Sequence, residues 1–265
     1  MAGFHEIIGH DDVVNHLQSA IVMDKVSHAY IINGPKDSGK MMLAQAFAMA
    51  LQCETSIRNR EGATGRPEEK LSPEILAEPC LECHSCKQAL GNNQPDIIYL
   101  THEKPNTISV ADIREQINHD IEIKPYSSKY KVYIVDEAEK MNQQAQNALL
   151  KTIEEPPEYG IIILLTSNMS AILPTIQSRC LTLEFRPLTT ATIEKYLIDN
   201  YHVVDYRART SAIFAQGNLG KAIRYIESED FEEKKNQVLY LLKNVRNMTV
   251  SEMLEKIKEI GEDKD

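Results

Sequence analysis

The stretch Gly34-Pro35-Lys36-Asp37-Ser38-Gly39-Lys40-Met41 follows an apolar run, Ala29–Ile32, and leads into a helix-like run that extends to about Gln52. A strand, a glycine-rich loop and a helix in this order are typical of a phosphate-binding loop. Glycines let backbone N–H groups turn towards an anion, and a helix N-terminus favours negative charge. We expect nucleotide contacts at Gly34, Ser38, Gly39, Lys40 and Met41. A glycine turn that holds no ligand is the alternative.

The last position of the loop departs from the complete motif. A Ser or Thr hydroxyl normally ligates Mg²⁺ there. Met41 carries a thioether instead, and Mg²⁺ selects oxygen ligands. The sequence therefore predicts a nucleotide site that lacks one part of its chemistry.

Apolar segments along the chain predict an α/β fold. Five of them are interpreted as buried strands, at residues 28–33, 97–101, 131–135, 161–166 and 181–185. Helical periodicity is found before and between them, at residues 10–23, 40–52, 109–121 and 142–155. Strands that alternate with helices indicate a five-stranded parallel sheet with right-handed crossovers.

The strands cease after Arg186-Pro187, which suggests a division into domains. We expect an α/β domain over residues 1–186 with an inserted module at about 53–90 that carries four of the five cysteines. Residues 54–79 within it form a polar stretch, interpreted as a surface insertion. A small all-helical domain is expected over 187–228. Residues 229–265 would begin a further helical region that is cut short, with a capping box at Thr249–Glu252.

Two acidic residues, Asp136 and Glu137, follow the strand at 131–135. Open α/β sheets bind ligands at the carboxyl ends of their strands. An aspartate there can hold Mg²⁺, and a following glutamate can polarise the attacking water of an NTPase. In the alternative interpretation Asp136 merely caps the next turn.

Four of the five cysteines are spaced for metal binding. Cys80, Cys83 and Cys86 place three thiols within seven residues, and Cys53 precedes them. Structural Zn²⁺ sites are commonly Cys₄, so Cys53 is the expected fourth ligand, with His84 as the substitute. The bacterial ferredoxin pattern needs a further cysteine shortly after Cys86, which is absent. Free reduced thiols remain the alternative.

Composition limits the classes of function. The formal charge is −10 and the pI is near 5.4, which argues against an autonomous nucleic-acid binder because phosphate neutralisation needs clustered Lys and Arg. No apolar run is long enough to span a bilayer, and no signal peptide is evident. We therefore expect a cytoplasmic protein without a membrane partner.

These motifs together resemble the AAA+ subunits of the bacterial clamp loader, part of the DNA polymerase III holoenzyme, and their delta-prime type in particular. The resemblance rests on the phosphate loop, on Val132–Met141, on Asn147-Ala148-Leu149-Leu150-Lys151-Thr152-Ile153-Glu154-Glu155-Pro156-Pro157 and on Ser178-Arg179-Cys180. It covers residue 4 to about 228 and includes the cysteine cluster. The 26 residues between Cys53 and Cys80 exceed the family's usual spacing.

The resemblance implies roles by position. Lys40 would face nucleotide phosphates, Asp136 with Glu137 would form the Walker B end, and Thr166 would be the sensor-1 polar group. Arg179 would be an arginine finger that acts in trans on ATP held by a neighbouring subunit. Such a finger contributes on the order of 10³–10⁵ in rate where it has been measured in NTPases.

Departures from the family decide between its members. Besides Met41, Gly220 stands where the ATP-hydrolysing gamma/tau subunits carry an arginine, in a segment, Gly217–Ala222, that resembles sensor 2. Lys221 is the alternative candidate for this role, although on a helix its side chain points about 100° away from position 220. Two losses with Arg179 intact resemble the delta-prime pattern.

Three hypotheses follow. The first is a non-hydrolysing, or weakly ATP- or ADP-binding, clamp-loader subunit. It would be a monomer alone, with delta and gamma/tau subunits as partners, and would meet the sliding clamp and primer-template DNA through the assembled complex. The second is an ATP-hydrolysing gamma/tau-type motor. The third is a zinc-containing P-loop kinase or a DNA-binding regulator, which the acidic charge disfavours.

Overall fold

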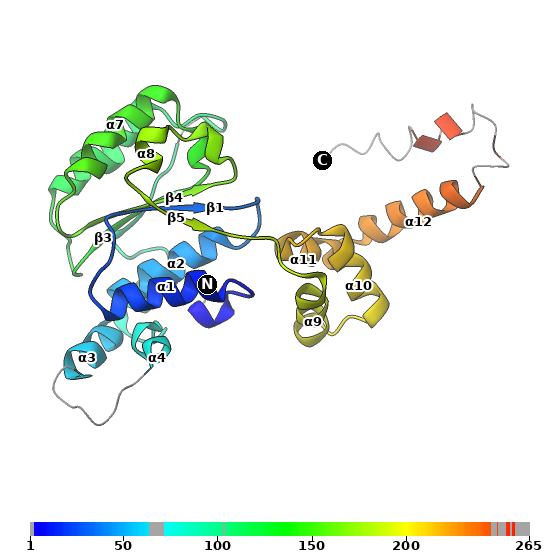
Figure 1. Cartoon of the computed structure of the whole chain (residues 1–265), viewed down its shortest axis with the longest axis horizontal. Helices are drawn as coiled ribbons and strands as arrows, with labels where there is room; N and C mark the ends of the chain where they lie inside the picture. The colour runs from blue at the N-terminus through cyan, green and yellow to red at the C-terminus, as the bar shows by residue number, and fades with distance from the viewer. Residues whose placement is uncertain are drawn as a thin grey trace. The chain divides into compact units, whose positions relative to one another are not determined.

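A parallel sheet of five strands forms the centre of residues 1–186 (Figure 1). The strands are β1 (Ala29–Asn33), β2 (Ile97–Tyr99), β3 (Lys131–Val135), β4 (Gly160–Thr166) and β5 (Leu181–Glu184). They lie in the order β2-β3-β4-β1-β5, and every neighbouring pair is parallel. The predicted α/β class and the five-stranded parallel sheet are confirmed.

The computed structural model describes residues 3–63, 72–102, 104–244, 248, 253, 254, 256 and 257. The chain divides into two units, Met1–Arg186 and Pro187–Asp265, and each is described by itself. The predicted capping box at Thr249–Glu252 lies outside the described residues. Within the described part of the chain, no helix combines the length and apolar character needed to cross a membrane.

Both faces of the sheet are covered by helices, as Figure 1 shows. On one face, residues such as Ile32 and Ile163 pack with α1 (Asp11–Val22), α2 (Lys40–Gln52) and α5 (His84–Leu90). On the other face, Ile31 and Ile162 pack with α7 (Gln143–Glu154) and α8 (Pro174–Gln177). Successive strand residues thus serve opposite cores, which explains why all seven residues of β4 are buried.

Short elements complete the first unit: η1 (Phe4–Glu6), α3 (Glu54–Ala63), α4 (Pro73–Ala77), α6 (Val110–Ile113), η2 (Arg114–His119), η3 (Asp120–Glu122), η4 (Ala138–Lys140) and η5 (Met169–Ala171). The helix predicted over 109–121 begins with a capping box formed by Ser109 and Asp112. It continues, however, as a π-helical turn, η2. Ile113, Ile117 and Ile121 lie four residues apart and would drift by about 40° per step on an α-helix. The wider turn offsets this drift, and all three are buried.

The polar stretch 54–79 is better anchored than expected from its composition. It contains α3 and α4, and residues 64–71 lie outside the described part. Leu76 and Ala77 are buried, and the Ser56 hydroxyl donates to the carbonyl of Glu78 at 2.6 Å. The interpretation as a surface insertion is therefore wrong for α4, which packs against α1.

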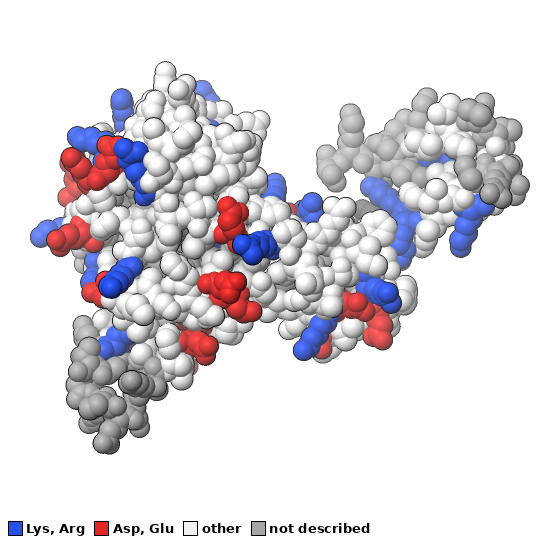
Figure 2. Space-filling view, viewed as in Figure 1, with Lys and Arg blue, Asp and Glu red and all other residues white. Residues whose placement is uncertain are grey.

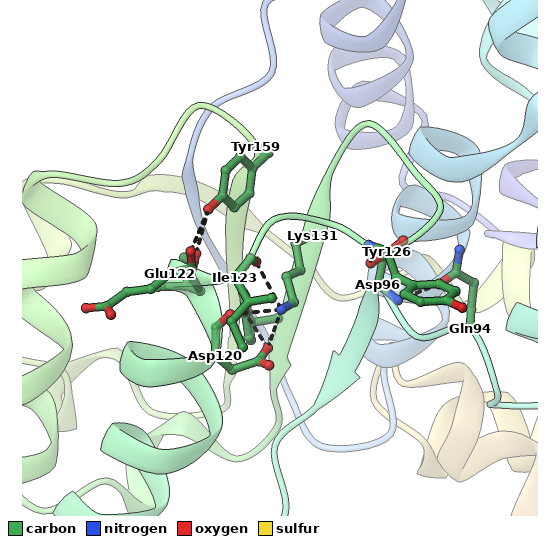
Figure 3. Close-up of polar contacts among 10 residues, drawn as sticks. Gln94, Asp96, Asp120, Glu122, Ile123, Tyr126, Lys131 and Tyr159 are labelled. Atoms are coloured by element: carbon green, nitrogen blue, oxygen red, sulfur yellow. Dashed lines mark hydrogen bonds and ion pairs between the residues drawn. The ribbon is translucent and has the colours of Figure 1, made fainter.

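Buried polar groups hold the amino-terminal ends of β2 and β3 in place (Figure 3). The Lys131 ammonium pairs with Asp120 at 2.8 Å and donates to the carbonyls of Asp120 and Ile123. Beside it, Asp96 accepts hydrogen bonds from the backbone N–H groups of Tyr126 and Ser127. These contacts hold the start of β3 in place. Because every residue of the strand is paired with β4, they also help to position its carboxyl end, which Asp136 follows.

The second unit consists of helices α9 (Thr190–Tyr201), α10 (Asp205–Phe214), α11 (Leu219–Glu227) and α12 (Glu229–Asn244). Its core contains Ile193, Leu197, Ala208, Ala212 and Ile226. Leu188 donates its backbone N–H to the carbonyl of Gly217, which ties the start of the unit to the turn before α11.

Candidate functional site

A cleft of about 520 Å³ opens at the carboxyl ends of β3 and β4, beside the loop that joins β1 to α2. Its lining is Lys36, Asp37, Gly39, Lys40, Met41, Met42, Asp136, Glu137, Glu139, Leu165, Thr166 and Ser167. The structure thus brings together Gly39, Lys40, Met41, Asp136, Glu137 and Thr166 from the predicted set. Gly34 and Ser38 belong to the same loop but are not among the residues that line the cleft.

The loop has the backbone of a phosphate cradle. Gly39 has a φ of +96°, a conformation that favours glycine. A Cβ on Gly34 would lie 2.5 Å from that of Phe185, so no larger residue fits there. Ser38 Oγ is buried and has no hydrogen-bond partner among the described residues. A buried, unpaired hydroxyl in this loop fits an anionic ligand that would accept from it.

Lys40 lies at the base of the cleft and is folded onto its own loop. Its ammonium donates to the carbonyls of Gly34 at 2.7 Å and of Pro35 at 2.6 Å. Burial lowers the pKa of Lys40, and the nearby carboxylates of Asp136, Glu139 and Asp37 oppose that effect. The lysine would exchange its carbonyl partners for phosphate oxygens on nucleotide binding.

The Asp136 and Glu137 carboxylates differ in whether a charged partner within the protein already engages them. Asp136 is exposed, and its Oδ1 accepts from the backbone N–H of Glu137 at 2.9 Å. Glu137 has a φ of +47°, and its carboxylate pairs with the Lys140 ammonium. Lys140 also donates to the carbonyl of Pro105 at 2.7 Å. The Glu137 carboxylate is therefore already held by an ion pair within the protein and is not free to orient a water molecule.

Glu139 is a cleft residue that the sequence analysis missed. Its carboxylate accepts from Ser167 Oγ at 2.5 Å and from the Ser167 N–H at 3.3 Å. It is also hydrogen-bonded to the Thr166 side chain. Burial raises the pKa of Glu139, but hydrogen bonds from Ser167 and Thr166 outweigh it and the net shift is downward. Its place three residues after Asp136, on the turn that closes β3, was the available signal.

The four predicted metal ligands lie together. The Sγ atoms of Cys53, Cys80, Cys83 and Cys86 all lie within 4.8 Å of one another. Four sulfurs at about 2.3 Å from a tetrahedral zinc would be about 3.8 Å apart. His84 is exposed and is not part of this group. Cys53 is therefore the residue that completes the cluster.

Backbone amides also point at these sulfurs. The N–H groups of Ser56 and Cys80 donate to Cys53 Sγ, that of Cys83 to Cys80 Sγ and that of Cys86 to Cys83 Sγ, at 3.3–3.4 Å. The hydrogen bond from Cys86 lowers the pKa of the Cys53 thiol, and the same contact with burial raises that of Cys86. Such amides stabilise thiolates, so the donor set fits a structural zinc ion.

Arg179 lies outside the cleft, between α8 and β5. Its Nε pairs with Glu154 Oε1 at 2.8 Å, and Nη1 donates to the carbonyl of Thr175 and the hydroxyl of Ser178. Its side chain is still 41% exposed. Cys180, beside it, packs against the core, and burial raises the pKa of its thiol to about 12.

The segment Gly217–Ala222 lies in the second unit. Asn218 caps α11 by accepting from the Lys221 N–H at 3.0 Å, and the Lys221 side chain is exposed. Gly220 is in the first turn of that helix.

Known proteins are similar to this chain in sequence, and others in fold alone. A family model described as "DNA polymerase III, delta subunit" matches residues 9–189. The chain is 35% identical over 191 residues to DNA polymerase III subunit tau of Bacillus subtilis, covering 72% of this chain and 30% of the relative. It is 31% identical over 230 residues to subunit delta' of the same organism, covering 86% and 63%. The chain thus spans less than two thirds of the length of these relatives.

Solved structures support the fold alone. A RuvB Holliday junction branch migration motor from Thermotoga maritima superposes with a TM-score of 0.53 at 16% identity, covering 97% of this chain and 72% of that one. The sequence likeness carries the family assignment: this chain belongs to the DNA polymerase III delta-subunit family of clamp-loader AAA+ proteins.

Proposed function

We propose that the chain is a clamp-loader subunit of the delta-prime type, which does not hydrolyse ATP in its own cleft and donates Arg179 to ATP held by a neighbouring subunit. The observation that carries this proposal is that two catalytic groups of an NTPase site are altered in this cleft. Met41 replaces the hydroxyl ligand for Mg²⁺, and the Glu137 carboxylate is engaged by Lys140. One metal-ligating hydroxyl is absent and the candidate base is held in an ion pair, while the Arg179 side chain stays accessible.

The geometry around Arg179 suits an action in trans. A guanidinium has five N–H donors in a rigid fork. The contacts with Glu154, Thr175 and Ser178 engage Nε and Nη1, and among the described residues Nη2 has no hydrogen bond or ion pair. The contacts at Nε and Nη1 orient the guanidinium, and its Nη2 donors can then bind phosphoryl oxygens.

The second candidate is an ATP-hydrolysing subunit of the gamma/tau type. The observation that favours it is that Lys40, Asp136 and Glu137 all lie at the cleft, together with the 35% identity to a tau subunit. This candidate requires nucleotide binding that Mg²⁺ strengthens. The delta-prime candidate predicts ATP or ADP binding that is weak and insensitive to Mg²⁺.

A zinc ion held by Cys53, Cys80, Cys83 and Cys86 belongs to the proposal as a structural group. All four positions would be filled by thiolates, which leaves no open position for catalysis. The expected partners are delta and gamma/tau subunits, with the sliding clamp and primer-template DNA reached through the assembled loader in the cytoplasm.

Steady-state ATP turnover by the purified chain tests the proposal. We expect no turnover above that of a Lys40→Ala variant, which controls for contaminating ATPase. Turnover that needs Mg²⁺ and disappears in Lys40→Ala would favour the gamma/tau-type candidate instead.

A further inference from the structure

The cleft is more acidic than a phosphate site requires. Four carboxylates, from Asp37, Asp136, Glu137 and Glu139, line it with two ammonium groups, from Lys36 and Lys40. Asp136 and Glu137 have counterparts in a hydrolysing site, where a metal ion would neutralise them. Glu139 has no such role, and its carboxylate lies at the end of β4, where a phosphate oxygen would need donors.

Glu139 engages the donors at this end of β4. The Ser167 hydroxyl and the Ser167 N–H both donate to its carboxylate. Thr166 is buried, its hydroxyl oxygen accepts from the Asn168 N–H at 3.1 Å, and its side chain is hydrogen-bonded to Glu139. The donors at this end of β4 that could bind a phosphate oxygen therefore already contact a negative charge of the protein itself.

We propose that Glu139 is a specificity-determining residue that makes this cleft discriminate against the terminal phosphate of a nucleoside triphosphate and favour a nucleoside diphosphate. The proposal deepens the proposed function, on which it rests. A carboxylate beside the bound nucleotide repels the added charge of a third phosphate, and it withholds the hydroxyl and amide donors at Thr166 and Ser167. The diphosphate, one group shorter, is penalised less.

Three variants separate charge from shape. Glu139→Gln keeps an oxygen that can accept from Ser167 but removes the charge. Glu139→Asp keeps the charge. Glu115→Gln removes a charge from an exposed position that is not part of the cleft lining. Folding of each variant is checked by circular dichroism and thermal unfolding, since Glu139 also holds the end of β4.

The measurement is calorimetric affinity for a non-hydrolysable ATP analogue and for ADP, with EDTA and with Mg²⁺. In EDTA we expect Glu139→Gln to bind the ATP analogue on the order of tenfold tighter than the parent chain, with a smaller gain for ADP. With Mg²⁺ the gain should shrink, because the ion neutralises part of the phosphate charge. Glu139→Asp and Glu115→Gln should show no gain.

Equal gains for both nucleotides would overturn the discrimination, and no gain for either, including no detectable binding by any variant, would overturn the role of Glu139. Failure of the proposed function has a different signature. It would appear as Mg²⁺-dependent turnover by the parent chain, whatever the ratio of affinities in Glu139→Gln.

Discussion

The cysteine cluster and the nucleotide cleft belong to the same unit and differ in completeness. The cluster presents four Sγ atoms within 4.8 Å of one another, a full donor set for a tetrahedral metal. The cleft keeps a glycine loop and Lys40 but has Met41 in place of a hydroxyl. A structural ligand is needed wherever the chain folds, whereas a catalytic metal is needed only where turnover occurs. The two sites can therefore be retained or lost independently.

The largest effect is expected from a substitution in the cysteine cluster. If the proposed zinc site is correct, Cys86→Ser should abolish stoichiometric zinc binding and lower the free energy of unfolding by roughly 4 kcal/mol or more, because a metal held by the four cysteines would link the end of α2 to the start of α5. Zinc content by mass spectrometry and denaturant unfolding measure both. Cys180→Ser is the matched control, and it should keep its zinc and lose only about 1 kcal/mol. Unchanged zinc content in Cys86→Ser would contradict the assignment.

A second variant separates loss of metal from loss of stability. The Asp96 carboxylate accepts hydrogen bonds from the backbone N–H groups of Tyr126 at 2.5 Å and Ser127 at 2.8 Å. In Asp96→Asn an amide NH₂ replaces one of these oxygens and faces an N–H donor that it cannot accept from. We expect a loss of roughly 1–3 kcal/mol in the free energy of unfolding, with zinc content unchanged. Loss of zinc in this variant would show that metal content reports general instability.

Restoring a hydroxyl at position 41 tests whether the nucleotide cleft lacks only this Mg²⁺ ligand. Met41→Thr should tighten binding of Mg²⁺–nucleotide on the order of tenfold, and the gain should vanish in EDTA because it depends on a metal–oxygen contact. Met42→Thr, one residue along α2, places its hydroxyl about 100° around the helix and should not gain. A gain that persists in EDTA would point to a general effect on the loop.

The smallest expected effect concerns the orientation of Arg179. Glu154→Gln weakens the contact with Arg179 Nε, which is 2.8 Å long and half exposed. Exposed ion pairs contribute little, so the ATPase rate of a reconstituted loader should fall by less than about fivefold. Glu155→Gln, the next residue, is the control. A rate increase in Glu154→Gln would mean that Glu154 restrains Arg179.

Much of this molecule could be predicted from its sequence, for physical reasons that differ by region. Strands buried on both faces are continuous apolar runs, so β1, β3 and β4 were found directly. The cysteine cluster was found because the short, local spacing of Cys80, Cys83 and Cys86 is typical of metal ligands. The fold class and the clamp-loader family, which the comparisons bear out, followed from these local patterns.

What was missed depends on contacts rather than on local pattern. Glu137 pairs with Lys140 and has a positive φ, a backbone conformation that a glutamate in the sequence does not predict. Glu139 became visible only when the ends of β3 and β4 were placed side by side. The contact between Arg179 and Glu154 joins two elements that are distant in sequence. The π-helical turn at η2 depends on the exact packing of three isoleucines.

The most direct test of a silent cleft beside an active Arg179 compares two variants in one reconstituted loader with full-length partners. Arg179→Ala should lower DNA-stimulated ATP hydrolysis at the neighbouring site by on the order of 10³, while Lys40→Ala in the chain's own cleft should leave the loader's rate unchanged. The opposite result, with Lys40→Ala slowing the loader and Arg179→Ala leaving its rate intact, would contradict the proposed division of labour.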